Sequence, residues 1–184
     1  LMYSDPGLWY ALLERLTDIV LSFALGQIRA GIQAFQLFDS WIGALSPRDY
    51  ARYIQPHVRR IFSTLAAPED GIPRVPLTHF GTGTASLLEL MTEAGGDVIG
   101  LDWRVTLDAG WARVGGPERV AVQGNLDPTV LLAPWDVVRA EAAEVLRQAG
   151  GRPGHIFNLG HGVLPQTPVE TLERLVALVQ GRDE

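Results

Sequence analysis

Apolar residues recur along this 184-residue chain with two different periods. In residues 6–31 they stand three and four positions apart, which is typical of one face of an α-helix. Residues 34–41 instead alternate between apolar and small or polar residues, which predicts a strand of about five residues. Residues 46–68 return to the helical period, and Pro56 predicts a kink or break within that helix.

The two periods continue to alternate to the end of the chain. Further strands are expected at 75–80, 97–103, 120–126 and 155–160, and further helices at 84–95, 107–115, 134–150 and 168–181. One helix followed by five strand–helix units indicates an α/β fold with parallel strands and right-handed crossovers. Two arrangements of the sheet fit this pattern: an open, doubly wound sheet of the flavodoxin type, or a (β/α)8 TIM barrel. A complete barrel has about 250 residues, so this chain would supply roughly its last five units.

Composition narrows the class of protein. With 47% hydrophobic and 20% charged residues, residues 1–184 are expected to form a single globular domain. The net charge of -6, without any block of lysine and arginine, argues against nucleic acid as a partner. No apolar run approaches the roughly 20 residues that span a membrane, and a signal-peptide pattern is absent, so we expect a cytoplasmic protein. The lack of cysteine excludes disulfides and thiolate metal ligands.

Polar residues follow each expected strand, where α/β proteins gather their functional groups. Asp39, Asp102 and Asp127 could serve as acid or base groups if they converge on one site. We favour the alternative that each caps a helix or a turn, most clearly for Asp127, which precedes a proline. The loop GTGTAS, residues 81–86, could bind phosphate through backbone amides. It lacks the lysine of a phosphate-binding loop, so a turn is favoured there too.

His161 is the most distinctive candidate for a ligand contact. Glycines on both sides would let a ligand approach the backbone and leave the imidazole at the end of a strand. The alternative is a histidine that is hydrogen-bonded within its own loop. His57 and His155 are expected to be structural or solvent-facing, and the place of His79 is open. No two histidines have the spacing of metal ligands, so no metal site is expected.

Four segments, in this order, carry a resemblance to a known family: QLFDSWIGALSP, GLDW, QGNLDP and NLGHGVLPQTP. Together they resemble the C-terminal half of the uroporphyrinogen decarboxylase family, and the resemblance extends over nearly the whole chain. It implies a homodimeric (β/α)8 barrel lyase of haem biosynthesis. Such an enzyme removes carbon dioxide from the four acetate side chains of uroporphyrinogen III and yields coproporphyrinogen III, with no metal or organic cofactor.

The resemblance also implies the residues of a substrate cleft. Ser40 and His161 match substrate-binding positions of the family, and Phe38 matches an aromatic position that lines the same cleft. The family's arginine-bearing loop, central aspartate and binding-site tyrosine would lie upstream of Leu1, so the catalytic residues are not expected within this chain. It follows that the chain alone should be inactive and should need the missing N-terminal half of the barrel as a partner.

Two other functions remain as alternatives. A related barrel family transfers methyl groups from corrinoid proteins and uses a zinc site with cysteine and histidine, which the absence of cysteine disfavours. The chain could also be a non-catalytic half-barrel assembly module, because a half barrel exposes apolar strand edges that favour pairing. The helix containing residues 8–23 is expected to be partly exposed if its neighbours in the intact barrel are absent.

Overall fold

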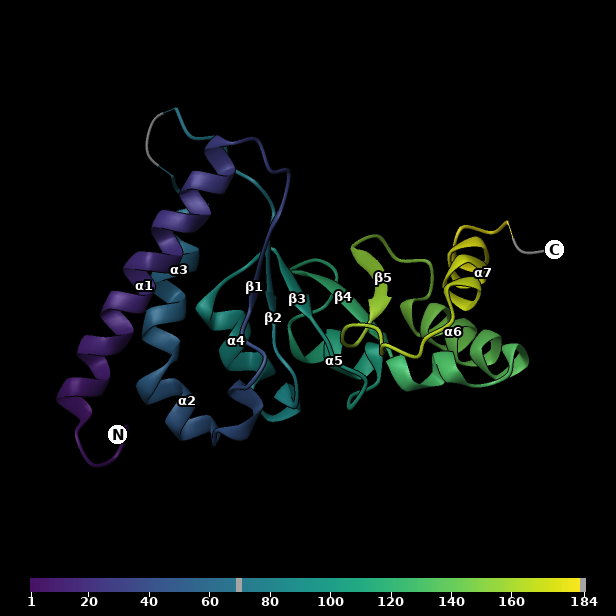
Figure 1. Cartoon of the computed structure of the whole chain (residues 1–184), viewed down its shortest axis with the longest axis horizontal. Coiled ribbons are helices and arrows are strands. Elements are labelled where there is room, and N and C mark those ends of the chain that lie inside the picture. The colour runs from purple at the N-terminus through teal and green to yellow at the C-terminus, as the bar shows by residue number, and fades with distance from the viewer. Residues whose placement is uncertain (69–70, 183–184) are drawn as a thin grey trace.

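The computed structural model describes residues 1–68 and 71–182, and it consists of helix α1 (Pro6–Arg29) followed by five strands with helices after each (Figure 1). The strands are β1 (Phe35–Phe38), β2 (Leu77–Phe80), β3 (Val98–Gly100), β4 (Ala121–Leu126) and β5 (His155–Leu159). The remaining α-helices are α2 (Pro47–Tyr53), α3 (Gln55–Ala66), α4 (Leu88–Ala94), α5 (Leu107–Arg113), α6 (Trp135–Ala149) and α7 (Val169–Val179). Short 3-10 helices lie at η1 (Ile42–Ala44), η2 (Thr84–Ser86) and η3 (Pro128–Leu132). The expected helix and five strand–helix units are confirmed.

All five strands are parallel and lie in the order β1-β2-β3-β4-β5. Each crossover therefore adds the next strand to the same edge, as in a barrel. A flavodoxin-type sheet would have the order 2-1-3-4-5 and a switch point where the direction of growth reverses. The open, doubly wound alternative is therefore wrong, and the barrel topology is confirmed.

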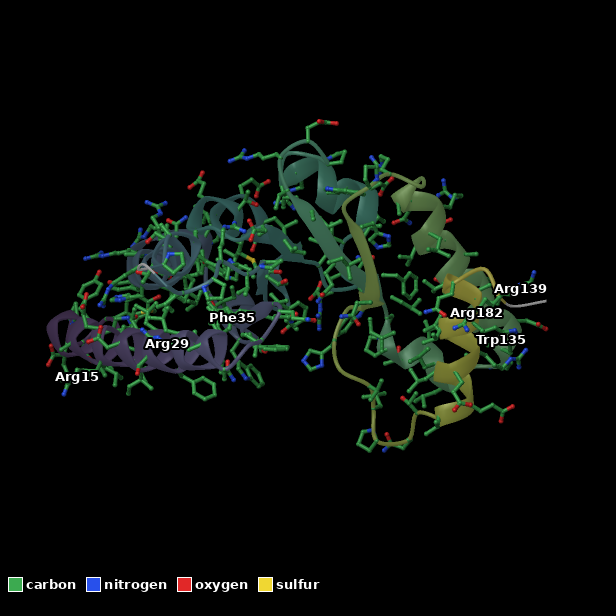
Figure 2. All side chains as sticks on the ribbon, turned by 90° about the horizontal axis from the view of Figure 1, so that it is seen from above. Arg15, Arg29, Phe35, Trp135, Arg139 and Arg182 are labelled. Carbon is green, nitrogen blue, oxygen red and sulfur yellow. The ribbon has the colours of Figure 1, made fainter. Side chains whose placement is uncertain are left out.

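The sheet is strongly curved. In a flat sheet β1 and β4 would lie about 14 Å apart, because two strands separate them. Nevertheless, the side-chain amide nitrogen of Gln123 on β4 lies only 3.2 Å from the amide oxygen of Gln36 on β1. Viewed from above, the elements follow an arc from α1 (purple) to α7 (yellow) (Figure 2). The sheet is open at both ends, and its edge strands are β1 and β5.

The helices pack on the outer side of the curved sheet and form its core. One apolar cluster joins β3 and β4 to α5 and α6 and includes Trp111, which is fully buried. The indole Nε1 of Trp111 donates a hydrogen bond of 2.9 Å to the carbonyl oxygen of Val120. A second cluster joins β1 and β2 to α1 and α3 and includes Phe62 and Leu65. Alternate strand residues are thus left to face the concave inner side.

The helix expected at 46–68 is broken, and the break comes just before Pro56. Helix α2 ends at Tyr53, and Ile54 has non-helical backbone angles, with φ at -121° and ψ at -50°. Helix α3 then begins at Gln55, so that the proline lies in its first turn. A proline is tolerated there because the amide hydrogens of a first turn have no partner within the helix.

Helix α1 exposes much of its apolar surface. The residues that it buries against the sheet and α3 are Thr17, Leu21, Ala24 and Ile28. By contrast, Ile19 and Phe23 are 63% and 66% exposed, and Leu8, Leu12 and Leu16 are exposed as well. The expectation of a partly exposed first helix is confirmed. Neither α1 nor any other helix in the described ranges is long and apolar enough to cross a membrane.

Candidate functional site

A cavity of about 360 Å³ lies on the concave side of the sheet, and we refer to it as the inner cavity. It brings together all three residues that the resemblance implied for a substrate cleft: Phe38, Ser40 and His161. The full lining is Gln36, Phe38, Ser40, Phe80, Gln123, Asn158, Leu159, His161 and Gly162. The strands β1, β2, β4 and β5 all contribute, so the cavity exists only because the sheet curves.

The alternation of β1 explains how Phe38 and Ser40 reach the inner cavity. Phe35 and Leu37 pack against the helices on the outer side, so the residues between and after them face inward. The backbone after β1 is also fixed to the backbone after β2. The amide nitrogen of Asp39 donates to the carbonyl oxygen of Phe80 at 2.7 Å, and the Thr82 hydroxyl donates to the carbonyl oxygen of Ser40 at 2.5 Å.

The glycine before His161 is required by a close backbone approach. A Cβ atom at Gly160 would lie 2.7 Å from the backbone nitrogen of Trp103, so no larger residue fits without movement. The amide nitrogen of Gly160 also donates to the carbonyl oxygen of Leu126 at 2.7 Å. These contacts hold His161 at the rim of the inner cavity, where its ring lies 6.3 Å from the ring of Phe80.

The imidazole of His161 is exposed, and it makes no hydrogen bond to residues 1–68 or 71–182. The alternative of a histidine bonded within its own loop is therefore not supported by the geometry. Beside it, Phe38 and Phe80 form an aromatic wall with an edge-to-face contact, their ring centroids 5.9 Å apart. Phe38 is itself 68% exposed. The inner cavity thus combines an apolar wall with a histidine and a hydroxyl at its rim.

The three strand-end aspartates do not converge on one site. Asp39 turns to the outer side, where its Oδ2 lies 3.9 Å from Nε2 of the buried His79. Asp127 caps η3 by accepting a hydrogen bond from the amide nitrogen of Thr129 at 2.8 Å. The interpretation of Asp127 as a turn residue is confirmed, and a shared acid–base role for the three carboxylates finds no support.

Asp102 is a buried anchor for two loops. Its carboxylate accepts from the backbone nitrogens of Gly83 and Arg104, at 2.5 and 3.0 Å, and from the guanidinium of Arg104 at 2.6 Å. The amide of Gly83 is therefore already used within the protein, which argues against phosphate binding by the loop at 81–86. Arg104 also stacks on Trp103, with its guanidinium carbon 4.1 Å from the ring centroid.

The other three histidines are built into the packing. Burial lowers the pKa of His57, which lies on α3. Nε2 of His155 lies 2.8 Å from the carbonyl oxygen of Gly124, and Nδ1 of His79 lies 3.4 Å from the carbonyl oxygen of Met91. Within the part of the chain that the structure describes, no three histidine, aspartate or glutamate side chains are grouped so that they could hold a metal ion.

Three amide side chains of the inner cavity were missed by sequence reasoning: Gln36, Gln123 and Asn158. Gln36 and Asn158 each stand between apolar residues on their strands, and Gln123 follows the buried Val122. This is the pattern of a side chain on the opposite face from the core. That signal indicates which face a residue occupies. It does not indicate that the face lines a concave site.

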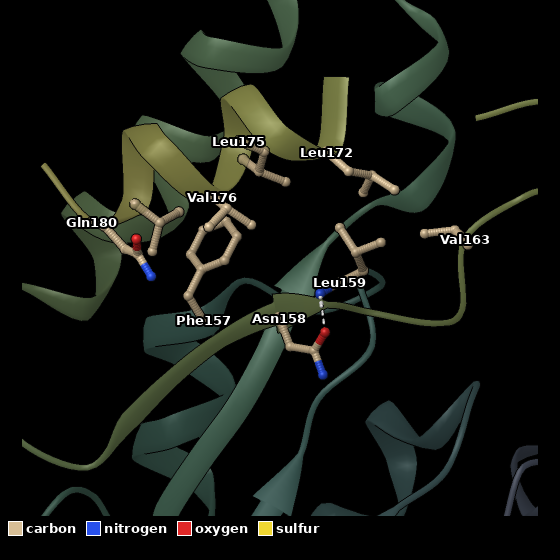
Figure 3. A pocket seen from close by; sticks show the side chains of 9 residues that line it. Phe157, Asn158, Leu159, Val163, Leu172, Leu175, Val176 and Gln180 are labelled. Atoms are coloured by element: carbon tan, nitrogen blue, oxygen red, sulfur yellow. Dashed lines mark hydrogen bonds between the residues drawn. The ribbon is translucent and has the colours of Figure 1, made fainter. Parts of the chain in front are cut away.

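A second cavity, of about 390 Å³, marks the open edge at β5, and we refer to it as the edge groove. Phe157 and Leu159 point toward α7, where Leu172, Leu175 and Val176 complete an apolar lining (Figure 3). Asn158 points the other way, toward the inner cavity. Together with the exposed face of α1, the edge groove leaves apolar surface at both ends of the arc.

Comparison with known proteins identifies the family. The family model described as "Uroporphyrinogen decarboxylase (URO-D)" matches residues 1–182. Relatives named uroporphyrinogen decarboxylase include one from Salinispora tropica, which is 56% identical over 179 residues, and one from Roseiflexus sp., which is 52% identical over 179 residues. Each alignment covers 97% of this chain but only 46% and 51% of those relatives. The chain thus spans about half the length of the curated relatives that it matches.

A solved structure supports the fold independently. A methyltransferase from Methanosarcina mazei superimposes with a TM-score of 0.74 over 90% of this chain and 47% of that protein, at 21% sequence identity. Such low identity supports a shared fold and no more. From the family match over residues 1–182, this chain belongs to the uroporphyrinogen decarboxylase family.

Proposed function

We propose that this chain supplies the last five strand–helix units of an eight-unit barrel that decarboxylates uroporphyrinogen III to coproporphyrinogen III. The observation that carries the proposal is the inner cavity, because Phe38 and Ser40 lie around the same space as His161, which is far from both in sequence. The family match over residues 1–182 and the sequential parallel sheet support the same function. In this proposal, residues 1–184 are one domain and form the C-terminal portion of the barrel.

The residues of the inner cavity suit a tetrapyrrole with many carboxylates. Ser40 donates its hydroxyl hydrogen, and His161 a ring N–H, to substrate carboxylates at the rim. Phe38 and Phe80 contact the apolar faces of the pyrrole rings. These four residues therefore bind and orient the substrate, which is a necessary part of catalysis but not all of it.

The reaction also needs a source of protons and positive charge. Protonation of a pyrrole carbon gives an iminium, which accepts the electron pair of the bond that breaks as carbon dioxide leaves. The former acetate carbon then takes a proton and the ring loses one, so each carbon dioxide released consumes one proton. The lining of the inner cavity contains no aspartate, glutamate, lysine or arginine. We therefore infer that the acid and the cations come from the other part of the barrel, and that this chain is inactive alone.

The open edges of the arc provide the surface for that partner. The exposed stripe on α1 and the edge groove at β5 and α7 lie at opposite ends of the sheet, where a barrel of eight units would be closed. Apolar surface and unpaired strand edges at both ends favour pairing with a complementary segment. The completed enzyme would be a cytoplasmic homodimer, as in the family that the sequence resembles.

Complementation tests the proposal. Residues 1–184 are produced alone, and also together with the N-terminal part of the Salinispora tropica relative that this chain does not match. Both samples are incubated with uroporphyrinogen III, and the products are oxidised and separated by their number of carboxyl groups. We expect coproporphyrinogen only from the combined sample, whose mass by light scattering should correspond to two copies of each part.

Two results would count against it. Product formation by residues 1–184 alone would contradict the inference that the active site is incomplete. A well-folded two-part complex that neither binds nor converts uroporphyrinogen III would overturn the proposed function itself.

A further inference from the structure

Two glutamines meet at the floor of the inner cavity. Gln36 comes from β1 and Gln123 from β4, and both side chains line the cavity. The interior of a parallel barrel is usually filled by bulky branched apolar residues. A pair of amides in this position costs desolvation energy unless the amides have hydrogen-bond partners, so their presence points to a polar ligand.

The hydrogen bond between the two amides fixes which groups remain for that ligand. Nε2 of Gln123 donates to Oε1 of Gln36 at 3.2 Å. The amide oxygen of Gln36 is thereby used, and its NH₂ group is turned away from Gln123. Within residues 1–68 and 71–182, that NH₂ group donates no hydrogen bond. It is therefore a neutral donor with two available hydrogens at the cavity floor.

The other polar groups of the inner cavity indicate the chemistry of the ligand. Ser40 and His161 add a hydroxyl and an imidazole at the rim, and the lining holds no carboxylate that would repel an anion. A cavity with several neutral donors and no acidic residue suits a carboxylate, whose two oxygens accept up to about four hydrogen bonds. Three donors from β1 and from the segments after β1 and β5 can then hold the carboxylates of one large ligand.

We infer that Gln36 binds a carboxylate of the substrate through its NH₂ group, and that Gln123 is a positioning residue that holds the amide of Gln36 in this orientation. The inference rests on the proposed function, because it names the substrate as a polycarboxylate. It adds two residues to those that the family resemblance implied. Because an amide does not ionise, this donor is available at every pH at which the substrate carboxylate is ionised.

Substitutions at the two positions separate binding from folding. Gln36→Glu keeps the shape but replaces the donor with a negative charge, and Gln36→Met keeps the length without any hydrogen bond. Gln33→Glu is the matched control, because Gln33 is exposed, precedes the same strand and does not line the inner cavity. All variants are made in the two-part complex described above, with uroporphyrinogen III as the probe and urea unfolding as the check on stability.

We expect Gln36→Glu to raise KM for uroporphyrinogen III by at least about tenfold, with kcat changed less than about threefold, whereas Gln33→Glu has no effect. Gln36→Met should raise KM by about three- to tenfold. Gln123→Met should also raise KM, but adding it to Gln36→Met should have no further effect, because Gln123 acts through Gln36. If the two glutamines had only a structural role, the substitutions would lower the free energy of unfolding, and the effect of Gln123→Met on KM would not depend on Gln36.

The inference is overturned if the wild-type complex converts uroporphyrinogen III and the Gln36→Glu and Gln36→Met complexes do so with an unchanged KM. If Gln36→Glu fails to fold, an unchanged KM of the Gln36→Met complex alone overturns the inference. A wild-type complex without activity is a different result, because it removes the proposed function on which the inference rests.

Discussion

The ring of Phe80 occupies the space in which any residue larger than glycine at position 100 would place its side chain. A Cβ atom at Gly100 would lie 2.6 Å from Cδ2 of Phe80 and 3.0 Å from its Cβ. The two residues are register partners on β2 and β3. Gly100 therefore determines where the aromatic wall of the inner cavity stands.

Gly100→Ala should push the Phe80 ring into the inner cavity. We expect a loss of about 1–3 kcal/mol in the free energy of unfolding, because the added methyl group overpacks the site. The complex should also bind uroporphyrinogen III more weakly. Gly26→Ala on α1 is the control, since apart from the helix's own backbone and the two neighbouring residues no atom would lie within 4 Å of the new Cβ. It should leave stability unchanged or raise it by up to about 1 kcal/mol. Equal urea midpoints for the two variants would contradict this account.

Trp111 should be the most costly single side chain to remove from the core. It is fully buried and its indole is hydrogen-bonded to the carbonyl oxygen of Val120. We expect Trp111→Ala to lower the free energy of unfolding by about 3–5 kcal/mol, and Trp111→Phe to cost about 1–3 kcal/mol because one hydrogen bond is lost. Trp41 is 88% exposed, so Trp41→Ala should change stability by less than about 0.5 kcal/mol. Chemical denaturation monitored by circular dichroism measures all three.

The buried His57 should make the protein less stable as the pH falls through the mildly acidic range. Burial lowers its pKa below the ordinary value of 6.5, an effect that Glu14 opposes and Arg60 reinforces. Between the two values the unfolded chain binds a proton that the folded chain does not, so stability falls as the pH decreases below about 6.5. For one proton the slope is at most about 1.4 kcal/mol per pH unit.

Urea midpoints of wild type and His57→Gln between pH 7.5 and pH 5.5 test this linkage, with those two pH values chosen to be about one unit on either side of the ordinary pKa. The variant should lose less stability over the interval than the wild type. If both proteins lost the same amount, or if the NMR titration of His57 gave a pKa at or above 6.5, the explanation would be wrong.

Ser40 and His161 should affect substrate binding without affecting the fold. Ser40 is only half-buried, and His161 is exposed and has no hydrogen bond within the described residues. We expect Ser40→Ala and His161→Ala in the two-part complex each to raise KM for uroporphyrinogen III by about ten- to a hundredfold, because each removes a hydrogen bond to a charged group. Ser63→Ala, on the exposed side of α3, is the control and should leave KM unchanged. An unchanged KM for both site variants would mean that Ser40 and His161 do not bind the substrate.

The order and type of the elements could be predicted because they depend on local periodicity. The break before Pro56 is a local effect as well, since it follows from the missing amide hydrogen of proline. The order of the strands in the sheet could not be predicted from periodicity, because it depends on which strands pair with one another although they are far apart in sequence. The family resemblance, together with the chain length, was needed to favour a barrel.

The buried face of α1 shows a limit of pattern reasoning. The helix has two apolar faces, and the more regular one, through Ile19 and Phe23, is exposed. The buried face includes Thr17, whose hydroxyl donates to the carbonyl oxygen of Leu13 at 2.7 Å and so tolerates burial. Gln36 and Gln123 were missed for a related reason. A glutamine on a strand indicates an exposed face, and only the curvature of the sheet turns that face into a cavity floor.

The exposed face of α1 provides the last prediction. If it packs against the complementary part of the barrel, Ile19 and Phe23 become buried on assembly, and burial of each contributes about 1.5–3 kcal/mol. The double substitution Ile19→Glu and Phe23→Glu should then weaken association by at least about a hundredfold, as measured by calorimetric titration with the N-terminal part. Stability of residues 1–184 alone should change little, because both side chains already face solvent. Val137→Glu makes the same kind of change at an exposed position of α6, at the other end of the arc from α1 and outside the lining of the edge groove, and should leave association intact. Equal affinities for the double variant and the Val137→Glu control would mean that α1 does not form the closing surface.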